Sequence, residues 1–291
     1  MILVTGATGN VGRQVVHQLT EVGHPVRALT RNPATAGLPE AAQVVKGDLE
    51  SIGQCLEGVE SVFLIWPFHT ADAAPAVVAA IARHARRVVL LSSGAVRDQP
   101  DSAVGLSHNE VEQWVEQSGL SWTMLWPSTF AANALWWADR IRAGNVVHGA
   151  FGAVPMAMLH ERDLAAVAVR ALTSDGHDGM RYTLTGPQVL TQVEQVRILG
   201  EAIGRPLRWQ ELSREAERRR LLADDTFPDS FVDPLLDGYA HMLDSPPPVV
   251  TTTVSDITGH PARTFAQWAT DHAAAFSQGP ATEVRRDTSW G

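Results

Sequence analysis

The stretch Met1-Ile2-Leu3-Val4-Thr5-Gly6-Ala7-Thr8-Gly9-Asn10-Val11-Gly12 opens this 291-residue chain and decides its fold. A short apolar run leads into three glycines at the spacing GxxGxxG, and apolar residues then recur at helical spacing. A strand, a glycine turn and a helix in this order are typical of a loop that holds a dinucleotide pyrophosphate. Gly6 allows the tight turn, Gly9 lets the backbone approach the phosphates, and Gly12 lets the helix pack closely on the strand. The free amides at the helix start attract the phosphate charge. The loop residues predicted to bind the cofactor are Gly6, Thr8, Gly9, Asn10, Val11 and Gly12.

Short apolar runs alternate with helical patterns through the first half of the chain, which predicts a doubly wound parallel α/β sheet of the Rossmann type. Six buried strands are expected at Met1–Thr5, Pro25–Thr30, Gln43–Lys46, Ser61–Ile65, Arg87–Ser92 and Leu120–Trp126. Helices are expected over Val11–Glu21, Ala73–His84 and Ser107–Ser118. Such sheets bind ligands at the carboxyl ends of their strands, so the residues that follow each strand matter most.

The rhythm changes after about residue 128, which predicts a second, smaller and mostly helical lobe over the strand ends. The predicted division is a Rossmann domain at 1–150, a lobe at 151–277 with a soft boundary and strands that can join the sheet, and a flexible tail at 278–291. Pro246-Pro247-Pro248 predicts a rigid turn. Further helices are expected at Phe130–Ile141, Leu164–Leu172, Gln192–Ile203, Arg214–Ala223 and Phe265–Phe276, and strands at Tyr182–Thr185 and Leu207–Leu212.

The composition excludes several classes of protein. With 32 acidic and 23 basic side chains the formal net charge is −9, which argues against nucleic acid or an anionic membrane as partner. A single cysteine, Cys55, excludes internal disulfides and cysteine-based metal sites and favours a cytoplasmic location. No segment is long and apolar enough to predict a signal peptide or a spanning helix. We expect a small-molecule enzyme without a metal, as a monomer or a homodimer.

The residue after the second strand indicates which dinucleotide binds. Arg31 stands where an acidic residue would hold the ribose hydroxyls of NAD, and a guanidinium suits a 2′-phosphate, so NADP(H) is expected over NAD(H). A solvated surface arginine is the alternative. Asp48, after the third strand, either bonds the adenine amino group or caps the short helix that follows. The other residues predicted to contact the cofactor are Leu49, Trp66, Pro67, Ser92 and Pro127.

On these motifs the sequence resembles the atypical short-chain dehydrogenase/reductase group, and within it the NmrA-like NAD(P)-binding proteins. The resemblance rests on Thr5–Gly12, Arg31, Gly47–Leu49, Leu91–Ser93, Ser118–Pro127 and His160–Asp163, and it weakens after about residue 210. It implies an NADP pocket. The group includes NADPH-dependent reductases of quinones and other conjugated aromatics, and also redox sensors that bind the dinucleotide without turnover.

The catalytic residues usual in this group are missing. The resemblance implies a tyrosine and, four residues later, a lysine that lowers the phenol pKa. Those positions hold Val104 and His108. Lys46, in the third strand, is the only lysine, and the only tyrosines, Tyr182 and Tyr239, lie far downstream. No shift of register restores the pair.

Three functions remain open. The first is a reductase of a quinone or other conjugated aromatic or polyketide-like compound, with water or His108 as proton source. Ser93, at the position of the family's catalytic serine, would bond the developing oxyanion, cap its strand or hold the nicotinamide ribose. The second is a redox sensor without turnover. The third is a non-redox tailoring enzyme of secondary metabolism with His108 or Glu112 as acid or base, a hypothesis that rests on an arginine-rich composition typical of GC-rich genomes.

Large aromatic residues follow several strands and favour a planar aromatic substrate over a sensor. We expect at least two of them to line a cavity. His108 is either a proton donor or a surface residue, and Asp163 is expected to be the N-cap of the helix that follows it. The residues predicted to contact substrate are Phe68, Trp126, Phe130, Trp136, Trp137 and His160.

Overall fold

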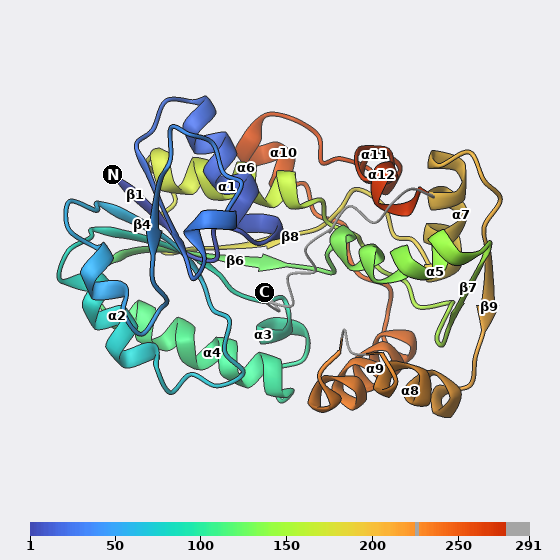
Figure 1. Ribbon diagram of the computed structural model, residues 1–291. Coiled ribbons are helices and arrows are strands. Elements are labelled where there is room, and N and C mark those ends of the chain that lie inside the picture. The colour runs from blue at the N-terminus through green and yellow to red at the C-terminus, as the bar shows by residue number, and fades with distance from the viewer. Residues whose placement is uncertain (225–226, 278–291) are drawn as a thin grey trace.

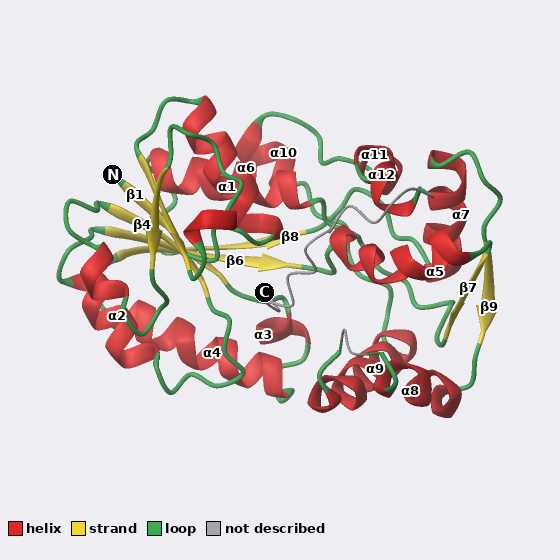
Figure 2. Cartoon of the chain, in the orientation of Figure 1, coloured by secondary structure: helices red, strands yellow, loops and turns green. Residues whose placement is uncertain are grey.

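A computed structural model describes residues 1–224 and 227–277. Seven parallel strands form one sheet in the order β3-β2-β1-β4-β5-β6-β8 (Figures 1 and 2). Because both faces of such a sheet are covered, its central strands Ile2–Val4, Ser61–Ile65 and Arg87–Leu91 consist mainly of valine, isoleucine and leucine. The strands are β1 (Ile2–Val4), β2 (Val26–Thr30), β3 (Gln43–Lys46), β4 (Ser61–Ile65), β5 (Arg87–Leu91), β6 (Ser121–Pro127) and β8 (Met180–Leu184). The predicted Rossmann sheet is confirmed.

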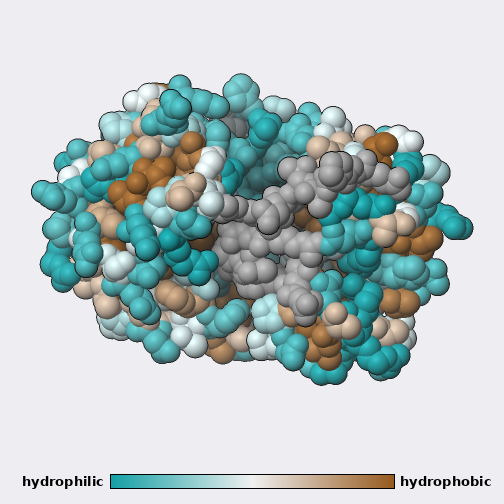
Figure 3. All heavy atoms as spheres, in the orientation of Figure 1, coloured by the Kyte–Doolittle hydropathy of each residue, from teal (hydrophilic) through white to brown (hydrophobic). Residues whose placement is uncertain are grey.

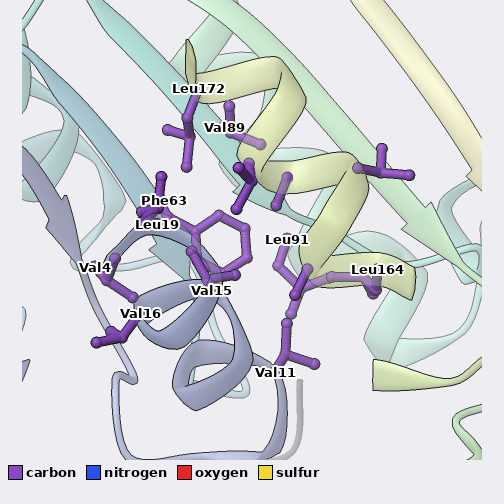
Figure 4. Close-up of a cluster of buried hydrophobic side chains, with 14 of the residues drawn as sticks. Val4, Val11, Val15, Val16, Leu19, Phe63, Val89, Leu91, Leu164 and Leu172 are labelled. Atoms are coloured by element: carbon purple, nitrogen blue, oxygen red, sulfur yellow. The ribbon is translucent and has the colours of Figure 1, made fainter. Parts of the chain in front are cut away.

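One face of the sheet is covered by α1 (Asn10–Glu21), α6 (Glu161–Thr173) and α10 (Thr253–Thr258). Val15 and Leu19 of α1 pack with Leu164 and Leu172 of α6 over Phe63 of β4 (Figure 4). Helix α1 ends as predicted, because Gly23 follows it in the left-handed conformation, at φ 79°.

The opposite face carries η2 (Ile52–Cys55), α2 (Ala74–Ala82) and α4 (Ala103–Glu116). The one-turn helix α3 (Ala95–Asp98) follows β5 at the carboxyl end of the sheet, and η1 (Pro33–Thr35) follows β2. Strand β3 lies at the sheet edge with Gln43 and Lys46 exposed, so its prediction as a buried strand was wrong. Its edge position leaves one side of the strand without a neighbour.

The smaller lobe lies beyond the carboxyl ends of the strands (Figure 1). Its core is formed by η3 (Ala131–Trp137), α5 (Ala138–Ala143), α7 (Gln192–Ala202), α11 (Phe265–Asp271) and α12 (Ala273–Phe276). A two-stranded sheet pairs β7 (Val146–Gly149) with β9 (Arg208–Glu211). Helices α8 (Arg214–Leu222) and α9 (Asp229–Asp244) form a separate apolar cluster.

The chain crosses between the two parts more than once. After η3 and β7 in the lobe it returns to the sheet as α6 and β8, re-enters the lobe with α7, and comes back as α10. Residues beyond 150 therefore complete the sheet, whereas the domain boundary itself stays a prediction. The predicted tail, 278–291, lies outside the described residues.

Pro246-Pro247-Pro248 stands outside helices and strands, on the connection from α9 to α10. Hydrophilic residues predominate on the face drawn in Figure 3. In the part of the chain that the structure describes, no helix is long and apolar enough to cross a membrane.

Candidate functional site

The glycine loop has the geometry that phosphate binding requires. Gly6 adopts φ 55°, in the left-handed region, and a Cβ added to Gly12 would lie 2.1 Å from the Gly6 carbonyl oxygen. Gly9 is the N-cap of α1 and has no side chain that could bond the first amides of the helix. These amides are therefore available to an anion. The loop fits a dinucleotide pyrophosphate, which would accept hydrogen bonds from these amides.

A cavity of about 540 Å³ extends from this loop along the ends of β1, β2 and β3. Its polar residues include Thr8, Arg31 and Asp48, and Leu49, Pro67 and Phe68 are also in its wall. Arg31 is exposed and makes no ion pair with the part of the chain that the structure describes, so its guanidinium is available to a 2′-phosphate. Phe68, predicted to contact substrate, lies in this nucleotide cavity.

The Asp48 carboxylate makes local bonds. Its Oδ1 accepts a hydrogen bond from the Ser51 amide at 2.9 Å and from the Ser51 hydroxyl at 2.7 Å, and these bonds lower the pKa of Asp48. These bonds close a turn before η2 and do not cap that helix, because its N-cap is Ser51 and it has no side-chain cap bond, so the helix-capping alternative was wrong. The carboxylate still borders the cavity, so an adenine contact stays a prediction.

A second cavity, of about 680 Å³, lies where the ends of β5, β6 and β8 face the lobe. Ser93, Trp126 and Pro127 line it from the sheet, and their roles in catalysis, substrate binding and cofactor binding stay predictions. Other lining residues come from distant segments, and no sequence pattern predicted them. They include Arg97, Ser128, Met156, Thr183, His241, Met242, Pro246–Pro248 and Thr251. Among these residues, Pro246–Pro248 had been noted in the sequence, as a rigid turn.

Ser93 and Ser92 face different surroundings. The Ser93 Oγ accepts a hydrogen bond from the Ala95 amide at 3.2 Å, which leaves its own hydroxyl proton free to be donated into the cavity. Ser92, predicted to contact the cofactor, is fully buried, and its hydroxyl donates to the Glu112 carboxylate. Ser92 thus lines neither of the two cavities.

The alternative that His108 is a surface residue was wrong. Its side chain is only 8% exposed on the inner face of α4, and burial lowers its pKa from 6.5 to about 4. The Nδ1 atom has no hydrogen-bond partner in the described structure, and His108 lines neither cavity. The imidazole is therefore neutral at pH 7, which leaves it little capacity as a general acid there.

The remaining predicted aromatic residues lie outside the larger cavity. Trp66 is buried and donates to the Thr70 carbonyl at 2.9 Å, while Phe130 packs against the core beside α6. Trp136 and Trp137 belong to η3, which carries the chain into the lobe, and they border a crevice of about 20 Å³ there. As cofactor or substrate contacts these four residues stay predictions.

The segment His160-Glu161-Arg162-Asp163 holds the lobe against the sheet. His160 is the N-cap of α6 and accepts a hydrogen bond from the Arg162 amide at 3.2 Å, so the prediction that Asp163 caps this helix was wrong. Asp163 lies one turn in and accepts from the Arg263 amide at 2.6 Å. His160 is 1% exposed and lines neither cavity.

Comparison with known proteins places this geometry in a family. Residues 6–175 match the family model described as NAD(P)H-binding. The chain belongs to this family, among the atypical short-chain dehydrogenases/reductases of the NmrA-like type. The match spans the glycine loop, the ends of β2 to β6 and α6, and it stops before β8.

Two named reductases are similar to the chain over nearly its whole length. The chain is 40% identical over 284 residues to a (4-alkanoyl-5-oxo-2,5-dihydrofuran-3-yl)methyl phosphate reductase of Streptomyces griseus, covering 95% of this chain and 99% of the relative. It is 35% identical to an NAD(P)H azoreductase of Xenophilus azovorans, with 95% and 99% covered.

A solved structure is also similar. The NADPH complex of a quinone oxidoreductase from Escherichia coli has a TM-score of 0.78 at 26% identity, covering 93% of this chain and 99% of that one. The protein is thus an NAD(P)H-dependent oxidoreductase, and NADP(H) is its cofactor. Of the three functions that the sequence left open, these relatives support the reductase.

Proposed function

We propose that the protein uses NADPH to reduce a small conjugated acceptor, without a tyrosine–lysine pair. The observation that carries this proposal is the larger cavity beside Ser93 and Trp126, in a chain with Val104 and His108 at the positions of that pair. Quinones and other planar conjugated aromatics are the first candidate class. The azoreductase and quinone oxidoreductase relatives support it.

When bound, NADPH supplies a hydride, and the protein's task is to orient the acceptor and stabilise the charge that develops on it. The Ser93 hydroxyl would donate a hydrogen bond to the acceptor's carbonyl oxygen as that oxygen becomes negative. Because the anion of a quinone or an enone is delocalised, water suffices to protonate it. The wall supplies an indole face from Trp126 and apolar contacts from Met156 and Pro247.

A second acceptor class is favoured by Arg97. The name of the Streptomyces griseus relative describes a ring double bond with two carbonyl groups on one of its carbons and a phosphorylated methyl group on the other. Arg97 lines the larger cavity and donates to Thr183 Oγ1 at 2.7 Å and to Asp98. Its side chain is 48% exposed, so a substrate phosphate would compete with Asp98 for it at small cost. An unsaturated lactone bearing a phosphate ester fits this arrangement.

The two classes separate in one assay. NADPH absorbance is followed with a quinone, an azo dye, and dihydrofuranones with and without the phosphate. Turnover of the quinone supports the first class, and turnover of the phosphorylated lactone alone supports the second. In the second case Arg97→Gln should lower kcat/KM for the phosphorylated compound by about tenfold, with exposed Arg83→Gln, at the C-cap of α2 and outside the cavity wall, as the matched control. NADPH binding without oxidation across the panel would contradict the proposed reductase.

We also propose a cytoplasmic location, as a monomer or a homodimer. The single cysteine, Cys55, is buried and unpaired, which suits a reducing compartment.

A further inference from the structure

A buried carboxylate lies directly behind the wall of the larger cavity. Glu112, on the sheet-facing side of α4, is 2% exposed and lines neither cavity. Its Oε1 accepts hydrogen bonds from the Ser92 hydroxyl and from Trp126 Nε1, the latter at 2.6 Å. Glu112 does not reach the space where substrate would lie, so it does not suit the acid or base role considered for it from the sequence.

The charge of this carboxylate is compensated from the sheet edge. Arg181 Nε, on β8, lies 3.5 Å from Glu112 Oε2, and Arg181 also pairs with Glu116 one helical turn further along α4. The guanidinium carbon stands 4.8 Å from the Trp122 ring centroid and 5.9 Å from that of Trp126. The Trp126 indole is therefore fixed by a charge-assisted hydrogen bond and by a cation stacked on it.

Burying a carboxylate has an energetic cost that apolar packing would avoid. The buried Glu112 carboxylate offsets part of this cost through its hydrogen bond to Trp126 Nε1, and that bond fixes the position of the indole. Trp126 is in the wall of the larger cavity, and Ser92 directly precedes Ser93, which lines the same cavity. The Glu112 bonds therefore fix two adjacent parts of the wall.

We propose that Glu112 is a positioning residue for the reductase reaction. Through Trp126 Nε1 and Ser92 Oγ it holds the indole face and the Ser93 hydroxyl in the orientation that an acceptor meets. The inference rests on the proposed function, because it assigns the larger cavity to the acceptor. It requires a hydrogen-bond acceptor at position 112 and no proton transfer from it.

The kinetic test uses three single variants and one double variant. Glu112→Gln keeps an oxygen for Trp126 Nε1 and should stay within about threefold of the wild type in kcat/KM for the acceptor. Glu112→Ala and Trp126→Phe should each lower kcat/KM by about tenfold. The double variant should be no worse than Glu112→Ala alone, because Glu112→Ala already removes the bond to Trp126. The Kd for NADPH should change less than twofold throughout.

The matched control is Glu116→Ala, which breaks an ion pair to the same Arg181 and leaves the Trp126 bond in place. It should keep the wild-type kinetics. Additive losses in the double variant, or a Glu112→Gln enzyme as impaired as Glu112→Ala, would overturn the proposal.

A structural readout separates this proposal from the proposed function. In a ¹⁵N-tryptophan spectrum, the indole signal missing from Trp126→Phe identifies the Trp126 N–H. That signal should be shifted downfield in the wild type, retained with a smaller shift in Glu112→Gln, and moved towards the free value in Glu112→Ala. If Glu112→Ala does not fold, Glu112→Gln and Trp126→Phe still carry the test. If none of the tested acceptors supports NADPH oxidation by the wild type, the proposed function is overturned. If the Trp126 indole shift is the same in Glu112→Gln as in the wild type, the positioning role is overturned.

Discussion

Arg31 is the residue on which we expect cofactor preference to depend. It stands exposed at the end of β2 in the nucleotide cavity, and the 2′-phosphate that it is proposed to bind is present in NADPH and absent from NADH. We predict that Arg31→Ala weakens NADPH binding by about 2 kcal/mol, or roughly thirtyfold, and leaves NADH binding within twofold. Fluorescence titration with both nucleotides measures this. Arg83→Ala, on the exposed end of α2, is the control, and an equal loss for both nucleotides would contradict the assignment.

His108 supplies a pH prediction with a definite sign. Burial lowers the pKa of His108 from 6.5 to about 4. Between these pH values the His108 imidazole is therefore protonated in the unfolded chain and neutral in the folded protein. His108 therefore opposes folding as the pH falls from 6.5 towards 4. We predict that His108→Gln makes the free energy of unfolding less pH-dependent in this window, by up to about 3 kcal/mol. Denaturant-induced unfolding of both proteins at pH 7.5, 5.5 and 4.5 tests this. The kcat/KM of His108→Gln should stay within twofold of the wild-type value between pH 6 and 8. A lost pH dependence of kcat/KM would instead identify His108 as the proton donor.

The glycines and Arg31 could be placed from sequence because a strand, a turn and a helix adjoin along the chain there. The larger cavity could not. Thr183, His241 and Thr251 reach it from β8, α9 and the segment before α10, and no local pattern relates segments so far apart. His108 also misled, because polar neighbours on α4 gave no sign that this position faces inward.

Among the elements, the start of α6 and the helix α11 are joined by buried charges. Glu161 is 3% exposed, and it accepts from Trp268 Nε1 at 3.0 Å and pairs with His272 Nε2 at 3.0 Å. Burial alone would raise the pKa of Glu161, but the bonds from His160 and His272 outweigh it and lower that pKa. Burial likewise would lower the pKa of His272, and the Glu161 carboxylate outweighs it and raises that pKa. Asp271, 3.5 Å from His160 Nε2, and Arg162 complete the charged groups around the pair.

This ion pair contributes stability over a limited pH range. The lowered pKa of Glu161 gives a contribution that is present above about pH 4.5, and the raised pKa of His272 gives one that is present below about pH 6.5 and lost as the pH rises through the folded value. We predict that His272→Gln costs about 1–2 kcal/mol at pH 5.5 and clearly less at pH 9. Urea unfolding at both pH values measures the difference. His260→Gln, on an exposed turn, serves as control, and an equal cost at both pH values would refute the ion pair's contribution.

Sequence patterns located most elements because their periodicity is strong, and they failed where the periodicity is interrupted. Helix α9 contains Pro234 and Gly238, which argue against a helix, yet its apolar side chains Val232 and Leu236 are buried in the lobe. Strand β7 has four residues, too few to show alternation, and its pairing with β9 joins segments about sixty residues apart. Tertiary packing decided both.

At the scale of the whole molecule, the path of the chain makes the sheet depend on residues beyond 150. Helix α6 buries Leu164, Ala168 and Leu172 against α1 and the sheet, and β8 pairs with the whole carboxyl half of β6. Each large apolar side chain is worth about 1.5–3 kcal/mol when buried, and the total stability of a domain is only about 5–15 kcal/mol. A fragment of residues 1–150 would expose this core and lose the outermost strand.

We therefore predict that the 1–150 fragment does not fold cooperatively, even though it contains the entire glycine loop and Arg31. Calorimetry should show no sharp unfolding transition, and a dye that binds exposed apolar surface should fluoresce strongly with the fragment and weakly with the full chain. NADPH titration should detect no binding, since the amides at the start of α1 are held in place only when α1 packs under α6. A fragment that melts sharply and binds NADPH would show that α6 and β8 are accessory to the nucleotide site, and the boundary near residue 150 would then mark an independent folding unit.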